Sequence, residues 1–566
     1  MSARWQELVA DKKLRQTASI PKIWLITSPP DSVLDVRKVP DECGLLTPKE
    51  VVITNTIEVQ TILANLATGK WTSLEVTLAF YKRAIIAQQL ASLVNCLTEI
   101  FVERALARAK ELDEQLKATG KLAGPLHGLP ISLKDQLSMK GLETTMGYVS
   151  WIGKYAERDS VLVRILYEAG AVPFVRTNVP QTLMWSETYN EVFGRTLNPA
   201  NRKLTSGGSS GGEGALMGMK GSPLGVGSDI GGSIRIPAGY NGLYGLRPSY
   251  GRLPYAGATN SLEGQDSIPS VLGPLSNSMS GIKIFMQAVS ASKPWLKDSL
   301  ARYAPWDASQ YTLAEHGGGK KLCFAIMWND GQTIPHPPVI RALEMTKNAV
   351  LAAGHKVVDW QPYKHKEICG AVYSIWTAGS KEDYASVADI TGEPVLNTME
   401  IEAEHGSAPN SFLPHQENVT AHKLWQTQKA RTAWRQEYLE HWNETGRVTG
   451  TGRPVDAVIS PISPYGGAPP HGKSRNVDYT AVWNGLDYSA CVFPTTRVHA
   501  TLDMKKSPHQ FLNERDKTHY SMWDPQTFWN APVSLQLVGR CQEEEAVIAM
   551  TEIVDAALKK QQVSKL

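Results

Sequence analysis

Glycine is concentrated in one stretch of the chain, and this limits how that stretch can fold. Residues 207–232 contain 11 glycines in 26 positions, against 46 in all 566 residues. A helix or strand that only packs against its neighbours does not need so many residues without a Cβ. Such density is expected where the backbone approaches another group closely or takes φ values that other residues avoid. We therefore expect either a tightly packed loop or a functional site.

The common phosphate-binding motifs do not account for these glycines. No G-x-x-x-x-G-K-[ST] sequence is present, and "GGGKK" at 317–321 lacks both the spacing and the hydroxyl of a phosphate-binding loop. No clean G-x-G-x-x-G opens a predicted helix either. Nucleotide binding is therefore not favoured.

One part of the segment, "GSSGG" at 208–212, matches the G-x-S-x-G motif of serine hydrolases, with Ser210 at the nucleophile position. That interpretation requires a strand before the serine and a histidine late in the chain. The preceding residues are polar and loop-like. His499, His509 and His519 lie late enough, but no neighbouring residue marks any of them as catalytic.

A second serine, Ser233, follows two glycines in "GVGSDIGGSIRIP" and has no histidine nearby. Its base could be a lysine, because Lys134 ends the apolar segment "GLPISLK". An ordinary lysine has a pKa of about 10.4 and is rarely neutral at pH 7. Burial in an apolar wall lowers the pKa and produces a usable base. The alternative, a solvent-exposed lysine, remains open from these residues alone.

The order of predicted elements indicates an α/β protein. Residues 72–90 begin with a capping-box-like Thr72-x-x-Glu75 and predict a helix, and residues 102–121 predict a second helix that ends at Gly120. Helical stretches separate short apolar strands, which is typical of an α/β core. The predicted strands lie within 125–135, 171–180, 224–232, 455–464 and 534–540, and a last helix within 543–560.

We expect three parts along the chain. Residues 1–48, rich in charge and proline, are predicted to form an N-terminal arm laid over the main body. Residues 49–560 are expected to form one large domain. Within it, 290–450 is predicted to be a helix-rich, Trp-rich insertion or cap that shapes the pocket.

Charge and cysteine content exclude some partners and compartments. The formal net charge is only +3 without any basic block, so nucleic acid and anionic membrane are not expected as partners. No apolar run resembles a signal peptide or a membrane span. The six cysteines are scattered without a C-x-x-C pair, which favours reduced thiols and a cytoplasmic protein.

Three segments taken together resemble the amidase signature family, in particular its fungal acetamidase-type general amidases. They are "GPLHGLPISLKDQ" (124–136), "GGSSGGEGALMG" (207–218) and "GVGSDIGGSIRIPAGYNGLYGLRPSYGRLP" (225–254). The similarity continues through "VPQTLMWSETYNEVFGRTLNP", "DAVISPISP" and "APVSLQLVGR". The resemblance implies a single large α/β domain with a mixed, twisted β-sheet core covered by helices on both faces.

The resemblance also implies a Ser–Ser–Lys triad. Ser233 matches the nucleophile, Ser209 the bridging serine on a cis peptide bond, and Lys134 the base. Ser210 would then be a supporting residue. The family's oxyanion hole consists of backbone N–H groups, and the matching residues are Ile230, Gly231, Gly232 and Ser233. "QTLMWSE" matches the substrate-facing loop, and the predicted pocket-wall residues are Leu183, Met184 and Trp185.

The function that follows is hydrolysis of a carboxylic amide through an acyl-enzyme on Ser233, without a metal or other cofactor. Asp229 and Arg235 flank the nucleophile, and we expect an ion pair that holds the loop in preference to recognition of substrate charge. Three other functions remain open, namely hydrolysis of a lactam, carbamate or aryl ester, an amidotransferase subunit, and a catalytically silent binding protein. The expected partner is a small-molecule amide, and relatives suggest a homodimer.

Overall fold

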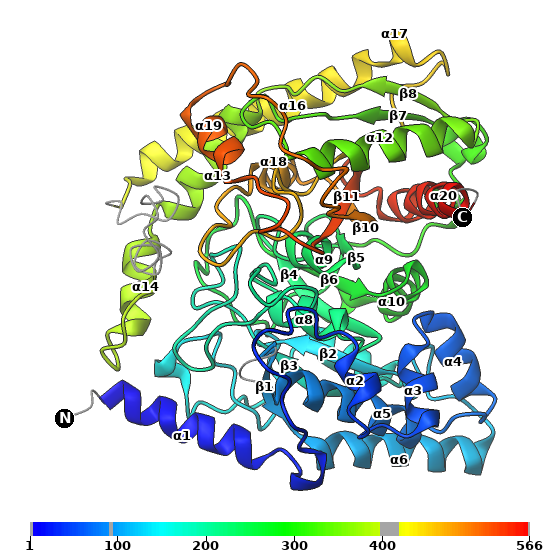
Figure 1. Cartoon of the computed structure of the whole chain (residues 1–566), viewed down its shortest axis with the longest axis vertical. Helices are drawn as coiled ribbons and strands as arrows, with labels where there is room; N and C mark the ends of the chain where they lie inside the picture. The colour runs from blue at the N-terminus through cyan, green and yellow to red at the C-terminus, as the bar shows by residue number, and fades with distance from the viewer. Residues whose placement is uncertain (1–3, 90–93, 397–417, 564–566) are drawn as a thin grey trace.

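A computed structural model describes residues 4–89, 94–396 and 418–563 of the chain (Figure 1). Within these residues, eleven strands form one mixed sheet in the order β1-β3-β2-β4-β6-β5-β10-β11-β9-β7-β8. The strands are β1 Leu97–Ile100, β2 Pro130–Lys134, β3 Val172–Thr177, β4 Leu224–Asp229, β5 Tyr244–Arg247, β6 Val271–Ser276, β7 Cys323–Ile326, β8 Lys356–Asp359, β9 Ala457–Pro461, β10 Ala490–Arg497 and β11 Pro532–Val538.

Helices cover both faces of this sheet, which confirms the predicted fold class. In the first half of the chain they are α1 Arg4–Ala18, α2 Val39–Glu42, α3 Pro48–Asn55, α4 Val59–Ala67, α5 Ser73–Gln88, α6 Val102–Thr119, α7 Val161–Glu168, α8 Gly211–Gly218, α9 Arg235–Asn241 and α10 Met279–Ala291. In the second half they are α11 Ala308–Tyr311, α12 Pro337–Ala352, α13 His365–Thr377, α14 Ser380–Ala388, α16 Ala421–Glu444, α17 Gly446–Thr449, α18 Asp478–Leu486, α19 Glu514–Met522 and α20 Glu544–Val563.

Two helices from the middle of the chain pack on the sheet next to each other. The helix α8 contacts β2, β3, β4 and β6, α9 contacts β5, β10 and β11, and the two helices contact each other. The helices α5, α6 and α7 contact β3, and α12 and α20 contact β10, β11 and each other. Local signals explain several boundaries. Thr72 and Glu75 form the expected capping box of α5, and Gly120 ends α6 in the left-handed conformation at φ 66°.

Three strands in the first half of the sheet run parallel, and they position the site. β2 lies between β3 and β4 and is parallel to both. Parallel strands end at the same edge, and Lys134, the last residue of β2, pairs with Thr177 at the end of β3. The crevice outside the carboxyl ends of parallel strands is the usual place for a ligand in α/β sheets. The loops that follow β3 and β4 therefore meet beside Lys134.

The sequence missed some strands of the sheet. β1 lies between the two helices expected in residues 49–120 and pairs antiparallel with β3. β7 and β8 lie within residues 290–450, and β7 pairs with β9, so this helix-rich region also extends the central sheet. Short strands such as these differ little from loop sequence, and tertiary pairing decides their conformation.

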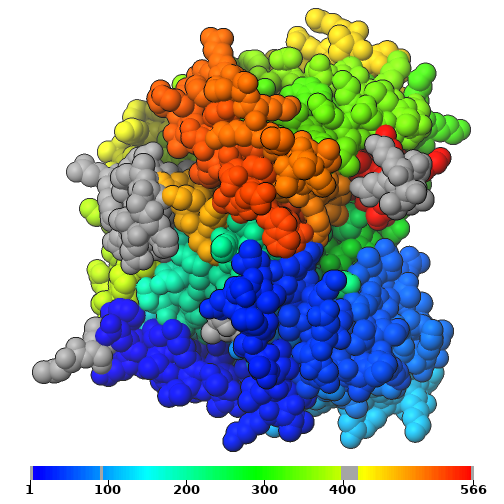
Figure 2. All heavy atoms as spheres, in the orientation of Figure 1, coloured from blue at the N-terminus to red at the C-terminus, as the bar shows by residue number. Residues whose placement is uncertain are grey.

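The residues of the predicted N-terminal arm lie on the surface of the molecule (Figure 2). The helix α1 is anchored by Lys12, whose side chain is only 3% exposed and pairs with both Glu99 and Glu143. In the described part of the chain, no helix is both long and apolar enough to cross a membrane. All six cysteines are free thiols.

The buried ion pairs of Lys12 predict that α1 contributes to stability. Lys12→Ala would leave Glu99 and Glu143 without this cation, and loss of one partner from a buried ion pair costs about 3 kcal/mol. We expect a clearly lower midpoint of thermal unfolding. Lys13→Ala is the matched control, because Lys13 is exposed on the same helix. Equal unfolding midpoints for the two variants would contradict this account.

Candidate active site

Lys134 is fully buried at the end of β2. Its Nζ lies 2.7 Å from Oγ of Ser209 and 2.7 Å from Oγ of Ser228. Burial disfavours the charged ammonium and lowers the pKa of Lys134 to about 7, although Asp229 and Glu213 favour the charged form. Near neutral pH a large fraction of Lys134 is therefore neutral, and its lone pair can accept a proton from a hydroxyl.

Two buried carboxyl groups act on Lys134, and they differ in charge. Burial alone would raise the pKa of Asp229, but the Arg235 guanidinium and further hydrogen bonds lower it to about 2. Burial raises the pKa of Glu213 to about 8, against opposing hydrogen bonds from a serine and a threonine hydroxyl. At pH 7 Asp229 is therefore ionised, whereas Glu213 largely keeps its proton. The negative charge that favours protonated Lys134 comes mainly from Asp229.

Ser209 is held beside Lys134 by a closely packed backbone. The peptide bond between Gly208 and Ser209 is cis, as the family resemblance implies. A Cβ on Gly208 would lie 2.3 Å from the carbonyl oxygen of Glu187 and 2.6 Å from that of Trp185. A neighbouring segment therefore passes so close that only glycine fits. Ser209 itself is 1% exposed, and its Oγ accepts the hydrogen bond from Lys134.

Ser210, the serine of the G-x-S-x-G match, has the contacts of a supporting residue. It is fully buried, and its Oγ bonds to both the backbone N–H and the carbonyl of Ser228, at 3.3 and 3.4 Å. Its backbone N–H donates to the carbonyl of Ser233 at 3.2 Å. Among the described residues, no hydrogen bond joins a histidine to Ser210. Ser210 thus connects β4 to the loop that carries Ser233.

Ser233 lies between β4 and α9 and lines a pocket, with 8% of its surface exposed. In the described chain, its Oγ makes no hydrogen bond, and none joins it to Ser209. Ser210 nevertheless binds the Ser233 carbonyl, and both Gly208 and Ser233 line the same pocket. The structure therefore brings Lys134, Ser209 and Ser233 to one place, with the first link of the predicted relay formed.

The loop around Ser233 presents backbone donors beside the pocket. Within the described residues, the N–H groups of Ile230, Gly231 and Ser233 have no acceptor. The N–H of Gly232 differs from the expectation, because it donates to Oδ1 of Asp229 at 2.8 Å. Gly232 has a φ of +133°, which only glycine adopts readily. Three of the four predicted oxyanion donors are therefore free in this structure, and the fourth anchors the loop.

A buried ion pair fixes this loop, as expected for Asp229 and Arg235. Their side chains are fully buried, with Arg235 Nε 3.0 Å from Oδ2 of Asp229 and Nη2 3.0 Å from Oδ1. Asn484 of α18 donates to Asp229 at 2.9 Å and accepts from Arg235. Asp229 also accepts the N–H of Ile234. Asp229 therefore holds the loop between β4 and α9, and it does not face the pocket.

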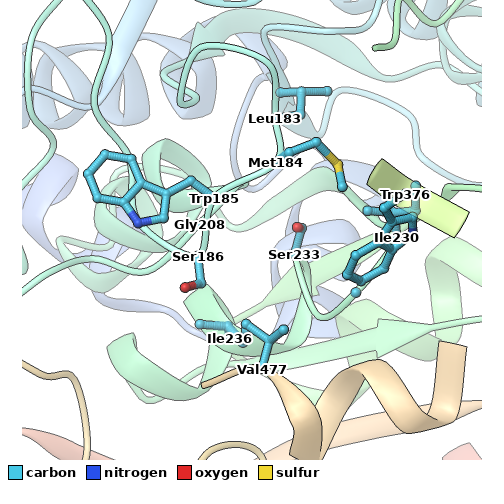
Figure 3. A pocket seen from close by; sticks show the side chains of 11 residues that line it. Leu183, Met184, Trp185, Ser186, Gly208, Ile230, Ser233, Ile236, Trp376 and Val477 are labelled. Atoms are coloured by element: carbon cyan, nitrogen blue, oxygen red, sulfur yellow. The ribbon is translucent and has the colours of Figure 1, made fainter. Parts of the chain in front are cut away.

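All three predicted wall residues line the pocket beside Ser233 (Figure 3). Leu183 and Met184 are buried, and Trp185 is half-buried. Figure 3 shows the Ser233 hydroxyl between Trp185 on one side and Trp376 on the other, with the indole of Trp185 directed away from it. The pocket contains about 320 Å³ of atom-free space, including its opening. Its complete lining is Leu183, Met184, Trp185, Ser186, Gly208, Ile230, Gly231, Ser233, Ile236, Trp376 and Val477.

Trp376 is the main pocket residue that the sequence did not indicate. It lies near the end of α13, in the region predicted to shape the pocket, and it is 3% exposed. A Cβ on Gly231 would lie 2.4 Å from Cη2 of Trp376, so the indole packs directly on residues 230–233, the donor loop that carries the free N–H groups. The Trp-rich composition of residues 290–450 was the available signal, but it did not identify this tryptophan.

The described residues contain no group of three or more His, Cys, Asp or Glu side chains arranged to hold a metal ion. The ionisable groups of the described residues at the site are those of Lys134, Asp229, Arg235 and the largely protonated Glu213. This set is suited to moving protons between an amine and hydroxyl groups.

Comparison with known proteins gives consistent matches. The family model Amidase matches residues 75–548. The acetamidase of Aspergillus oryzae is 42% identical over 564 residues, covering 98% of this chain and 99% of that protein. The acetamidase of Emericella nidulans is 42% identical over 563 residues, with 99% of each chain covered.

Solved structures agree with this result. Fatty acid amide hydrolase has a TM-score of 0.88 and 32% identity, covering 98% of this chain and 95% of that one. Peptide amidase from Stenotrophomonas maltophilia has a TM-score of 0.63 at 19% identity, covering 89% of this chain and 97% of that one. The second match shows the fold alone.

The pKa of Lys134 predicts how the reactivity of Ser233 depends on pH. If neutral Lys134 is the base, the rate of labelling by a fluorophosphonate should rise with pH, through a midpoint near 7, and then level off. The sign follows from the loss of the lysine proton as pH increases. Mass spectrometry of the Ser233 peptide would measure this rate. A rate that is constant from about pH 5 to about pH 9 would contradict this role of Lys134.

Proposed function

Since the chain belongs to the amidase signature family, we propose that this amidase hydrolyses small carboxylic amides through an acyl-enzyme on Ser233. The observation that carries the proposal is the 2.7 Å hydrogen bond between buried Lys134 and Ser209, next to the pocket that Ser233 lines. The family membership establishes amide hydrolysis. The triad and the covalent intermediate are the proposed part.

In the first step, neutral Lys134 takes the proton of Ser209, and Ser209 takes the proton of Ser233. The Ser233 oxygen attacks the amide carbon, and the carbonyl oxygen becomes an oxyanion. The N–H groups of Ile230, Gly231 and Ser233 are placed to donate to it, and a preorganised donor of this kind contributes about 3 kcal/mol.

In the second step, the carbon–nitrogen bond breaks. The proton held by Lys134 returns through Ser209 to the leaving nitrogen, and ammonia or an amine departs. Water then loses a proton to the same relay and attacks the ester carbon. The carboxylic acid is released, and Ser233 regains its proton. Lys134 therefore begins and ends the cycle neutral.

The contacts of Lys134 suit this exchange. Lys134 donates to the hydroxyls of Ser209 and Ser228 in the structure. A neutral amine has one lone pair and two N–H groups, so at the same positions neutral Lys134 can accept from Ser209 while it still donates to Ser228. Ser228 remains as a second partner and can keep the amine oriented throughout the cycle. The lowered pKa of Lys134 places it near the pH at which a base and its conjugate acid are both available.

The size and character of the pocket indicate the substrate. Its walls are mainly apolar, and none of the described residues that line it is charged. In Figure 3, Met184 lies above the Ser233 hydroxyl and Trp376 lies to its right. We therefore propose uncharged amides with a short apolar group, which agrees with the names of the two fungal relatives.

Removal of each triad residue tests the mechanism. Lys134→Ala, Ser209→Ala and Ser233→Ala should each lower kcat for acetamide by at least about 10³-fold, because residues that act as a unit fail together. Ser222→Ala is the matched control, since Ser222 is also fully buried but donates to the carbonyl of Leu224, outside the pocket. Ammonia release measures the rate, and thermal unfolding reports on the fold. Undiminished activity of Lys134→Ala would overturn the proposal.

Trp376 predicts the size limit of the substrate. Trp376→Ala should raise kcat/KM for larger aliphatic amides relative to acetamide by about tenfold, because the indole fills space beside Ser233. Trp185→Ala is the comparison variant and should change this ratio less, since its indole points away. A series from acetamide to hexanamide measures the ratio. An unchanged ratio in Trp376→Ala would show that Trp376 does not limit the substrate.

A further inference from the structure

We propose that Glu393 is a positioning residue that acts through Gln181 to hold the pocket wall formed by Leu183 and Met184. Glu393 does not line the pocket and does not touch Ser233. Its effect on the reaction would be indirect, through the shape of the wall. The inference rests on the proposed function, because it concerns how the same site selects its amide.

Glu393 is buried and receives three hydrogen bonds. It is 4% exposed, and its Oε1 accepts from the backbone N–H of Ser150 at 2.9 Å. Its Oε2 accepts from the N–H of Val149 at 2.9 Å and from Nε2 of Gln181 at 3.0 Å. In the part of the chain that the structure describes, no lysine or arginine pairs with Glu393. Three N–H donors therefore take the place of a counter-ion, which favours a fixed position for this carboxylate.

The side chain of Gln181 binds residues 393–396 through further hydrogen bonds. It is 3% exposed, and its Oε1 accepts from the N–H of Leu396 at 2.6 Å. Its Nε2 also donates to the carbonyl of Pro394 at 3.1 Å. The Gln181 amide thus uses both its oxygen and its nitrogen to bind residues 393–396. Two segments more than 200 residues apart in sequence are joined by these bonds.

The residues directly after Gln181 show why such a connection is needed. Thr182 and Leu183 have φ values of +70° and +62°, in the left-handed region that side chains with a Cβ rarely occupy. Such conformations persist only where the surrounding structure determines them. Thr182 Oγ1 accepts the N–H of Met184 at 3.2 Å, and this bond shapes the turn. Leu183 and Met184 enter the pocket from this turn.

The chemistry of the carboxylate makes the connection specific to glutamate. Its two oxygens accept all three N–H groups at once. A glutamine at position 393 has one acceptor oxygen, and its NH₂ group would face a donor. Glu393→Gln should therefore leave at least one buried N–H without an acceptor, at nearly unchanged volume.

The test compares Glu393→Gln, Gln181→Ala and the double variant on straight-chain amides from acetamide to hexanamide. We first identify the amide whose kcat/KM in the wild type differs most from that of acetamide. In each single variant, the kcat/KM of this amide relative to that of acetamide should change by about tenfold in the direction of equal values, because the displaced wall no longer distinguishes the chain lengths. KM should change for the longer amide, with kcat for acetamide retained within about threefold. The double variant should match the single variants, because both residues act in one connection.

Asp383→Asn is the matched control. Asp383 lies in α14, in the same part of the chain, and its carboxylate accepts the N–H of Leu262 at 3.0 Å without contact to Gln181. It should leave the chain-length ratio unchanged. A uniform loss of activity on all amides in Glu393→Gln, together with a lower unfolding temperature, would show a general structural role and overturn the proposal. Effects that add in the double variant would overturn it as well.

Hydrogen exchange separates this proposal from the proposed function. In Glu393→Gln, exchange at the N–H groups of Val149, Ser150 and Met184 should accelerate, whereas exchange in β2 should not change. This readout does not require amide hydrolysis. An inactive wild type would refute the proposed function and leave the exchange result to decide on the connection. Exchange and chain-length ratio both equal to those of the wild type would refute the connection itself.

Discussion

The site depends on a lysine placed where water cannot reach its amine. Lys134 lies at the end of the middle strand of three parallel neighbours, and this burial lowers its pKa to about 7. The cost of the placement is offset by two hydroxyl partners and by ionised Asp229. Because parallel strands end at one edge, the same geometry brings the pocket wall after β3 and the donor loop after β4 to this amine. The positions of Lys134, of the pocket wall and of Ser233 therefore all depend on the parallel arrangement of β3, β2 and β4.

Local sequence patterns predicted the strands that hold the site residues, and the family resemblance supplied the expected catalytic role of each residue. The apolar segments that became β2, β3 and β4 and the capping box of α5 are local signals, so they could be found without tertiary information. The use of the Gly232 N–H by Asp229 depends on a φ value and a side-chain position that no motif encodes. Trp376 lines the pocket and Glu393 binds Gln181 from distant segments of the chain, and only the packed structure shows which of many similar residues make these contacts.

The site therefore has two parts, the reacting groups and the pocket wall, which differ in how well they tolerate substitution. The relay and the donor loop are enclosed in buried backbone and a buried ion pair, where most substitutions leave a polar group without a partner. The pocket wall comes partly from Trp376 of α13, and residues 393–396 bind Gln181 just before the wall residues Leu183 and Met184; both segments belong to the helix-rich second half of the chain. Changes there can alter which amide fits while the reacting groups keep their positions.

Gly208 and Gly231 have different neighbours where a Cβ would lie, so substitution at the two positions is constrained in different ways. The space beside Gly208 is filled by main-chain atoms of Glu187 and Trp185, which a change of side chain does not remove. A second side-chain substitution therefore cannot make room for a Cβ at position 208. The space beside Gly231 is filled by the Trp376 side chain. A smaller residue at position 376 would make room for a Cβ at position 231, so substitutions at these two positions can compensate for each other.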